Sequence, residues 1–454
     1  MPRPSGLKYT RSIERVFYIW ILRTSQVISI ENPAEFKRSL LLWAQHFREV
    51  VFLDSNHYPQ KYSSYDCMLA ADAFTSIKTD HHNAFDDLKQ YQQTTKDWLF
   101  GYLSYDLKND TEDLESQNHD GLDFPDLYFF QPKKLLLLNG NQLEMRYLHI
   151  CDDEIESDLS EINNCRIEPL KEPFPIPKIH PRITKEEYLA KAGSMLEHIH
   201  RGDIYEANFC MEFYAENAAI DPVQTYLKLN TISEPPFAAF FKNHNHFALS
   251  ASPERYLRKQ QNKVISQPIK GTARRSSDPG EDRDIQIELE QNQKERSENI
   301  MIVDLVRNDL SRTATKGSVE VEELCSVYAF RQVHHLISTV VSKVDPQISP
   351  VDIIKSTFPM GSMTGAPKIS AMKIIEKLEE TKRGLYSGAL GYFTPDGDFD
   401  FNVVIRSILY NAEKKYVSFS VGSAITSLSD PESEYEECLL KAGAMMKVVG
   451  RDEG

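Results

Sequence analysis

The sequence lacks paired cysteines and long apolar runs, and each absence excludes a class of protein. Six cysteines are scattered over 454 residues without a C-x-x-C pair. This pattern argues against a disulfide framework or a zinc site and predicts reduced thiols in the cytoplasm. The longest N-terminal apolar run, residues 16–22, is too short to cross a bilayer. We therefore expect no membrane partner and interpret this run as the first strand.

Positive charge is also scarce. The net charge is −15, with 52 basic against 67 acidic side chains, so the surface offers no electrostatic footprint for nucleic acid or for an anionic membrane. An anionic substrate must then be attracted by a local cationic pocket. The hydrophobic content of 41%, with 10% aromatic residues, is ordinary for a globular enzyme.

Two catalytic motifs are missing. Gly361, Gly365 and Lys368 superficially resemble a phosphate-binding loop, but their spacing differs from the required G-x-x-x-x-G-K-[ST]. Nucleotide hydrolysis is therefore not indicated. None of the six cysteines lies in a Gly-x-Cys-x-Gly elbow, so the chain shows no glutaminase nucleophile of that kind.

A proline-spaced segment divides the chain. Five prolines between residues 169 and 181 favour extended backbone. Residues 184–187 then resemble a capping box that opens a helix through about residue 200. The acidic stretch 110–123 has few large apolar side chains and is expected to be an exposed loop. We predict two regions, residues 1–175 and 176–454.

The second region mixes helical and strand patterns. Ile300, Val303, Val306 and Leu310 repeat at three-to-four spacing and predict a helix. Residues 385–393, 402–409 and 416–421 predict consecutive strands, with a hairpin turn at residues 396–397 between the first two. Sequential antiparallel strands with helices between others favour an α+β fold over a doubly wound sheet.

The stretch QPIKGTAR (residues 267–274) presents a lone amine, Lys270, before a Gly-Thr turn and two arginines. Gly271 lets backbone approach a bound molecule, and Arg274 and Arg275 suit a carboxylate. An amine held beside positive charge has a lowered pKa and can act as a nucleophile. The alternative is a surface turn with a solvated lysine.

Two glutamate pairs follow on predicted helices. Glu295 and Glu298 share one helix face, and Glu434 and Glu437 share another on a helix that Asp430 can cap. Carboxylates without histidine or cysteine suit Mg²⁺, which takes few protein ligands and keeps waters. The alternative is two solvated helix faces in an acidic protein.

Arg406 lies in a strand pattern that is otherwise apolar. An arginine without a partner is costly to bury. Taken alone, this position therefore predicts an internal salt bridge.

Six ordered motifs resemble the chorismate-utilising enzymes. The resemblance is strong over residues 185–446 and weaker over the N-terminal third, and it implies a pair of stacked antiparallel sheets flanked by helices. The motifs are SASPERYL (250–257), ERSENIMIVDLVRNDLSR (295–312), FPMGSMTGAPKISAM (358–372), GLYSGALGYF (384–393), FNVVIRS (401–407) and DPESEYEECLLKAGAM (430–445).

Within that family, Lys270 is similar to the lysine of aminodeoxychorismate synthase large subunits, where anthranilate synthases usually carry alanine. Ser362 and Thr364 favour the same branch. The resemblance implies Mg²⁺-dependent amination of chorismate to 4-amino-4-deoxychorismate, with ammonia from a separate glutamine amidotransferase. One alternative is the anthranilate synthase large subunit. Another is a non-catalytic regulatory subunit, which we expect to have lost Glu298, Glu437 or Arg406.

The resemblance also implies a role for each site residue. Glu298 and Glu437 are implied as direct Mg²⁺ ligands, with Glu295 and Glu434 acting through water. Lys270 is implied as the nucleophile and Glu254 as the general acid for the departing 4-hydroxyl. The residues implied to contact the substrate are Gly271, Thr272, His335, Ser362, Tyr386, Arg406 and a backbone turn at Gly422, Ser423 and Ala424.

Two departures from the family and one further pocket complete the interpretation. Glu206 stands where relatives that use ammonia usually have glutamine and relatives that use water have a lysine base. Ser423 or Ala424 stands where family members tend to have a second glycine. The residues that resemble the family's tryptophan pocket are Ser55, Tyr62, Ser63, Ser64, Tyr65, Pro236, Phe237 and Ala238.

Overall fold

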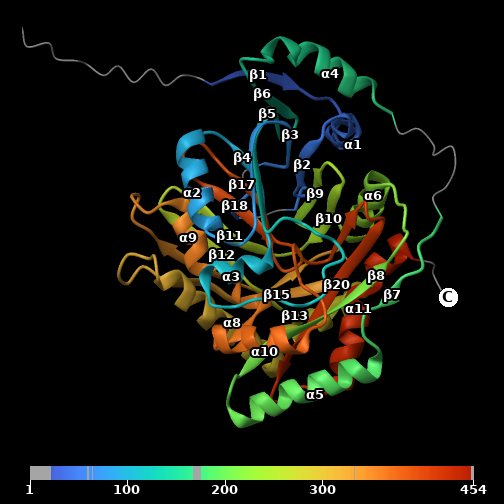
Figure 1. Cartoon of the computed structure of the whole chain (residues 1–454), viewed down its shortest axis with the longest axis vertical. Helices are drawn as coiled ribbons and strands as arrows, with labels where there is room; N and C mark the ends of the chain where they lie inside the picture. The colour runs from blue at the N-terminus through green and yellow to red at the C-terminus, as the bar shows by residue number, and fades with distance from the viewer. Residues whose placement is uncertain (1–21, 59–60, 64, 167–174, 332, 451–454) are drawn as a thin grey trace, which may run out of the picture.

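A computed structural model describes residues 22–58, 61–63, 65–166, 175–331 and 333–450 (Figure 1). The expected strand at residues 16–22, apart from Leu22, and the predicted pocket residue Ser64 lie outside these ranges. The described strands form one hydrogen-bonded network of 20 strands, and every paired register within it is antiparallel. Helices flank this network, which confirms the α+β class.

The strands are β1 (Arg23–Ser29), β2 (Glu49–Asp54), β3 (Cys67–Thr79), β4 (Leu99–Leu103), β5 (Leu127–Asn139), β6 (Gln142–Leu148), β7 (His180–Pro181), β8 (Glu206–Ala215), β9 (Phe237–Asn243), β10 (His246–Ser252), β11 (Arg255–Gln260), β12 (Lys263–Gln267), β13 (Ile269–Arg274), β14 (Glu320–Ala329), β15 (Val333–Lys343), β16 (Gly365–Ala366), β17 (Ala389–Phe393), β18 (Phe399–Val403), β19 (Ser407–Asn411) and β20 (Tyr416–Thr426).

The α-helices are α1 (Pro33–Trp43), α2 (Ala84–Thr95), α3 (Lys108–Thr111), α4 (Ile155–Asn164), α5 (Lys185–Arg201), α6 (Pro222–Ser233), α7 (Pro279–Gln291), α8 (Gln293–Ser311), α9 (Pro350–Thr357), α10 (Lys368–Leu378) and α11 (Pro431–Val449). In Figure 1, α1 and α4 lie at one end with β1 and β6, while α5, α8 and α10 lie at the opposite end.

Two hydrophobic cores lie on opposite faces of the strand network. In β2, Val50 and Phe52 belong to one core and Val51 to the other. In β3, Leu69 belongs to the first core and Met68 to the second. Alternation with a period of two sends neighbouring side chains of a strand to opposite faces. The network is therefore packed on both sides.

Strands from both predicted regions pair with each other. β2 pairs with β9, and β4 pairs with β17, so hydrogen bonds cross the expected boundary at residue 175. The division into residues 1–175 and 176–454 stays a prediction about the sequence, because the two regions share one strand network.

The local signals in the sequence are confirmed at three helices. α5 begins with a capping box in which Thr184 and Glu187 each accept from the other's backbone N–H. α8 buries Val303, Val306 and Leu310, although Ile300 is 39% exposed. Asp430 caps α11, with Pro431 at its first turn. In the part of the chain that the structure describes, no helix is long and apolar enough to cross a bilayer.

The predicted strand at residues 402–409 is wrong. The hairpin of β17 and β18 around residues 396–397 is present, but β18 ends at Val403 and β19 begins at Ser407. Between them Arg406 has φ of +52°, in the left-handed region that β-strands exclude. This backbone conformation, which a hydropathy pattern does not reveal, turns the chain where the arginine stands.

Candidate active site

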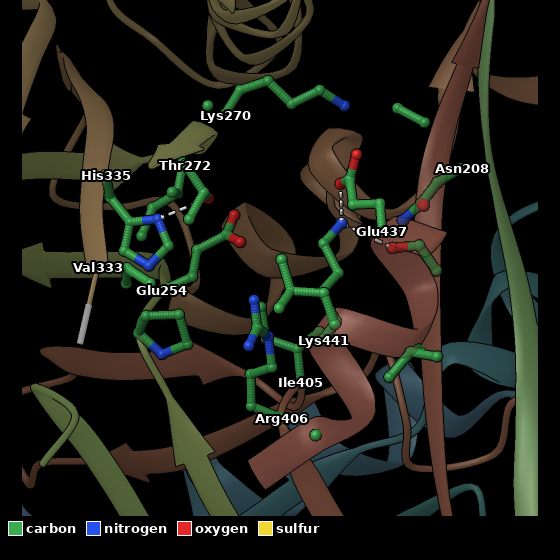
Figure 2. Close-up of a pocket in the computed structure, with 18 of the residues that line it drawn as sticks. Asn208, Glu254, Lys270, Thr272, Val333, His335, Ile405, Arg406, Glu437 and Lys441 are labelled. Carbon is green, nitrogen blue, oxygen red and sulfur yellow. Dashed lines mark hydrogen bonds and ion pairs between the residues drawn. The ribbon is translucent and has the colours of Figure 1, made fainter. Parts of the chain in front are cut away.

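The predicted site residues line one cavity of about 1000 Å³ between β13, α8, β15, β20 and α11 (Figure 2). Of the predicted catalytic, substrate-contacting and metal residues, Ser423 alone is absent from its lining. The residues brought together are Glu254, Lys270, Gly271, Thr272, Glu295, Glu298, His335, Ser362, Tyr386, Arg406, Gly422, Ala424, Glu434 and Glu437.

Lys270 projects from a β-bulge and not from the turn that we predicted. Ile269 pairs with Ile337 and Thr272 with His335, so β13 has one more residue than β15 over this interval. Gly271 has φ of +97°, and a Cβ there would lie 3.1 Å from Glu295 Oε2. The bulge therefore requires glycine and aims the preceding lysine along the cavity.

The pKa of Lys270 shifts in the direction opposite to our prediction. Burial lowers this pKa, but the carboxylates of Glu206 and Glu298 outweigh burial and raise it. Lys270 Nζ lies 3.0 Å from Glu206 Oε1 and 4.0 Å from Glu298 Oε2. Lys270 is consequently a cation in the free protein and must lose a proton before it can act as a nucleophile.

Arg275 does not supply the positive charge that was expected beside Lys270. Its guanidinium pairs with Asp282 at 2.7 Å and donates to the carbonyl of Phe330 at 3.0 Å. Asp282 also contacts His334 at 2.8 Å. These interactions hold α7 against β13, so the charge of Arg275 is already paired with Asp282, although Arg274 and Arg275 both line the cavity.

Glu206, which sequence comparison left unexplained, is the partner of Lys270. It is the first residue of β8 and only 3% exposed. Its Oε1 accepts from Lys270, while Oε2 has no hydrogen-bond partner among the described residues. A lysine at position 206 would place a second cation against Lys270, whereas the Glu206 carboxylate pairs with the Lys270 amine.

Glu254 has the properties of a general acid. It is 5% exposed, and Ser362 Oγ donates to its Oε1 at 2.7 Å. Burial raises the pKa of Glu254 to about 7. A carboxyl group with such a pKa remains protonated in neutral solution to a useful extent and can release its proton to a leaving group.

His335 is neutral in this environment. Its Nδ1 lies 2.9 Å from Thr272 Oγ1, and its ring packs edge-on against Phe330. Burial, followed by the charge of Arg406, lowers its pKa to about 3. The ring can therefore exchange hydrogen bonds with a substrate but carries no charge toward it.

Arg406 faces the cavity without an internal salt bridge to any described residue. Burial lowers its pKa, although the guanidinium stays charged because its ordinary pKa lies far above neutral pH. Tyr386 also lines this part of the cavity, and burial raises its pKa so that its hydroxyl stays protonated. A cation and a hydroxyl beside each other can bind a carboxylate.

The predicted turn at residues 422–424 is part of β20. Ser423 Oγ lies 3.1 Å from the Tyr188 hydroxyl in the core, so its side chain points away from the cavity. Gly422 in β20 lies opposite Cys210 in β8, but the two residues bond elsewhere. The Gly422 carbonyl accepts from Lys441 Nζ at 2.8 Å, and the Cys210 N–H donates to the Glu379 carboxylate. This opposite pair is not hydrogen-bonded, so the Gly422 N–H points away from β8.

All four glutamates line the cavity, and Glu295, Glu298 and Glu437 lie close enough for their charges to interact. Burial raises the pKa of Glu298 to about 7, and burial with the charge of Glu437 raises that of Glu295. Burial also acts on Glu437, but Lys441 at 2.5 Å outweighs it and lowers the pKa. Like charges that raise one another's pKa indicate a place for a cation.

The donor set fits Mg²⁺ chemically, because this ion binds one or two carboxylates and retains several waters. Among the described residues, no three histidine, cysteine, aspartate or glutamate side chains already form a closed metal cluster. In this structure, Glu437 Oε1 pairs with Lys441 at 2.5 Å and Glu298 Oε2 lies 4.0 Å from Lys270.

Sequence reasoning missed Lys441 and Asn208, which both line the cavity. Lys441 lies one helical turn after Glu437, and this i,i+4 spacing was the available signal. Asn208 comes from β8, far from the other motifs, and no local pattern marked it.

Part of the predicted tryptophan pocket lies around a separate cavity of about 70 Å³. Ser55, Ser63, Tyr65, Pro236, Phe237 and Ala238 line it. Tyr62 does not, because its hydroxyl contacts Lys263 and Glu322 instead. The volume is below the roughly 300–1,000 Å³ of typical small-molecule sites. Binding of an effector here stays a prediction.

Comparison with known proteins places these features in a family. Residues 48–447 match the chorismate binding enzyme family. A probable chloroplastic aminodeoxychorismate synthase of Oryza sativa is 42% identical over 59% of this chain, which spans only 30% of that relative's length. Aminodeoxychorismate synthase component 1 of Klebsiella aerogenes is 33% identical over 76% of each chain. Anthranilate synthase component 1 of Saccharolobus solfataricus is 32% identical, over 78% of this chain and 81% of the relative.

The fold is shared with solved structures as well. Anthranilate synthase component I from Streptococcus pneumoniae has a TM-score of 0.74 and 24% identity, over 86% of this chain and 93% of that one. The match to the family extends over most of the described strand network and includes every residue that lines the large cavity. The chain belongs to the family of chorismate binding enzymes.

Proposed function

We propose that this chain catalyses Mg²⁺-dependent amination of chorismate to 4-amino-4-deoxychorismate, a step toward p-aminobenzoate and folate. The observation that carries the proposal is Lys270, whose amine lies in the cavity that Glu254 and Arg406 also line (Figure 2). Relatives named aminodeoxychorismate synthase support it. Ammonia would come from a separate glutamine amidotransferase.

Substrate binding follows from the charges of the cavity. Arg406 and the Tyr386 hydroxyl would bind the enolpyruvyl carboxylate. Glu298 and Glu437 would hold Mg²⁺, with Glu295 and Glu434 contacting its waters. When bound, the ion supplies positive charge for the ring carboxylate. The Gly422 N–H adds a backbone donor.

The chemistry requires two displacements. Lys270 Nζ, after passing a proton to Glu206, forms a bond to ring C2 while the double bond shifts and the C4–O bond breaks. Glu254 gives its proton to that oxygen, which leaves as water. Ammonia then forms a bond to C4, the double bond shifts back, and the electron pair of the C2–N bond returns to Lys270. The amine therefore ends on C4.

Anthranilate synthase is the second candidate, because a relative of that name aligns over most of both chains. It would place the amine ortho to the carboxylate and release pyruvate. Lys270, similar to the lysine of the first group, favours amination at C4. A regulatory role is disfavoured because Glu298, Glu437 and Arg406 are all retained and line one cavity. The cytoplasm is the proposed location, supported by six unpaired cysteines.

The nitrogen source provides one test. Because no cysteine lies in a glutaminase elbow, we expect the purified chain to aminate chorismate with ammonium salt at alkaline pH and to show no reaction with glutamine. Product formation is followed by chromatography with each nitrogen source. Glutamine-dependent turnover by this chain alone would contradict the proposed partner.

The pH dependence provides another test. Glu254 acts as an acid only when protonated, so kcat/KM at a fixed concentration of NH₃ should fall as the pH rises through about 7. In Glu254→Gln this fall in kcat/KM above about pH 7 should disappear, and the rate should drop roughly 10²–10⁴-fold. Asp304→Asn, on the exposed side of α8, is the control. A Glu254→Gln variant that keeps the wild-type profile would exclude Glu254 as the acid.

A further inference from the structure

A second, small cavity lies behind Glu254. Its volume is about 20 Å³, and Glu254, Tyr256, Asp309, Thr357 and Ser362 are among the residues that line it. A cavity needs roughly 10–15 Å³ and two or more polar partners to hold one water. The space is therefore large enough for a single water between Glu254 and Asp309.

Asp309 supplies a polar atom that needs such a water. It lies near the end of α8, is 4% exposed, and accepts from Lys368 Nζ through Oδ2 at 2.6 Å. Its other oxygen, Oδ1, is buried and has no hydrogen-bond partner among the described residues. Buried polar atoms are rarely left without a partner, and ordered water commonly supplies it.

The remaining polar groups around the cavity are already engaged with each other. The Tyr256 hydroxyl lies 2.6 Å from Thr357 Oγ1, and Ser362 Oγ donates to Glu254. Lys368 Nζ also donates to the carbonyl of Thr357 at 3.1 Å. The carboxyl groups of Asp309 and Glu254 are therefore the two proton-exchanging groups that face this space.

We propose that this cavity holds a water through which the Asp309–Lys368 pair returns a proton to Glu254 in each turnover. The inference rests on the proposed function, in which Glu254 releases its proton to the leaving hydroxyl. Lys368 gives a proton to Asp309, Asp309 passes one to the water, and the water passes one to Glu254. Lys368 is then reprotonated from solvent.

The proton balance of the reaction creates the need for this route. When NH₃ replaces the hydroxyl and leaves as R–NH₃⁺, all three of its hydrogens stay with the product. Glu254 must then regain one proton from solvent. Glu254 lines both cavities, so bound chorismate would lie on its large-cavity side and the small cavity offers a path on the other side.

The electrostatics of the pair are consistent with proton exchange. Burial raises the pKa of Asp309 and lowers that of Lys368. Both shifts bring the neutral form of the pair closer in free energy to the charged form. A buried ion pair of this kind can shift its proton more readily than one at the surface.

The test compares the first turnover with later ones in Asp309→Asn. With enzyme in excess, at a pH well below the Glu254 pKa of about 7 and with ammonium salt, most of the Glu254 begins protonated. We expect the first turnover to keep its wild-type rate, while steady-state kcat falls roughly tenfold or more. The KM for chorismate should not change. Asp304→Asn, on the same helix but exposed, should alter neither rate.

A double variant distinguishes loss of the proton route from misfolding of Asp309→Asn. Replacement of both charges in Asp309→Leu/Lys368→Met removes the pair without leaving an unpaired buried charge, and it should show the same split between first and later turnovers. An equal loss of rate in the first and in later turnovers would indicate that the pair has a structural role only. No loss of rate in either would exclude the proton route through Asp309 and Lys368. If the wild-type chain forms no 4-amino product, the proposed function fails instead.

Discussion

Lys270→Ala should abolish most 4-amination of chorismate while leaving chorismate and Mg²⁺ binding intact. The expected loss in kcat is roughly 10²–10⁴-fold, the range for a side chain that takes part directly in the chemistry. The reason is that the substitution removes the amine that we propose attacks C2, whereas Arg406 and the glutamates remain. Any residual product should shift toward ortho amination. Lys263→Ala, whose lysine pairs with Glu322 outside the large cavity, is the control.

Intact-protein mass spectrometry tests the covalent step separately. Wild-type protein incubated with chorismate and Mg²⁺, without ammonia, should gain an adduct that peptide mapping assigns to Lys270. Lys263→Ala should form the same adduct, and Lys270→Ala should form none. If no adduct forms and the alanine variant aminates C4 at the wild-type rate, Lys270 acts on specificity and not as the nucleophile.

Glu298→Gln and Glu437→Gln should each fold normally and lose activity by more than 100-fold. An amide is a much poorer ligand for Mg²⁺ than a carboxylate. Glu295→Gln and Glu434→Gln, which would alter contacts through water, should lose only roughly 10–100-fold. Circular dichroism checks folding, and titration of Mg²⁺ against rate measures the change in metal requirement.

The order of these four effects is the informative part. Glu298→Gln and Glu437→Gln should raise the Mg²⁺ concentration needed for half-maximal activity far more than Glu295→Gln and Glu434→Gln do. Unchanged activity and Mg²⁺ dependence in both Glu298→Gln and Glu437→Gln would rule out the metal site. A stronger effect for Glu295 or Glu434 would reassign the direct ligands.

Local signals in the sequence predicted several elements correctly. The capping box at Thr184 and the Asp430 cap act within one helical turn, so the residues that cause the structure are neighbours in sequence. The hairpin at residues 396–397 is likewise determined by its own turn residues. The set of residues that line the cavity was predicted from the family resemblance and not from local signals, because their motifs are spread from residue 250 to 445.

The properties that depend on distant contacts could not be predicted. Glu206 raises the pKa of Lys270 although it lies 64 residues away in sequence. Asp282 and the carbonyl of Phe330 take the Arg275 charge that the motif offered to a ligand. The left-handed backbone at Arg406 interrupts a strand whose apolar pattern continues through it. Each of these depends on packing between elements.

The product formed from chorismate, Mg²⁺ and ammonium salt by the purified chain tests the central claim most directly. Nuclear magnetic resonance of the isolated product distinguishes an amine on C4 with the enolpyruvyl group retained from an ortho-aminated aromatic acid with pyruvate released. We predict 4-amino-4-deoxychorismate without pyruvate. Anthranilate and pyruvate in equal amounts would contradict this account.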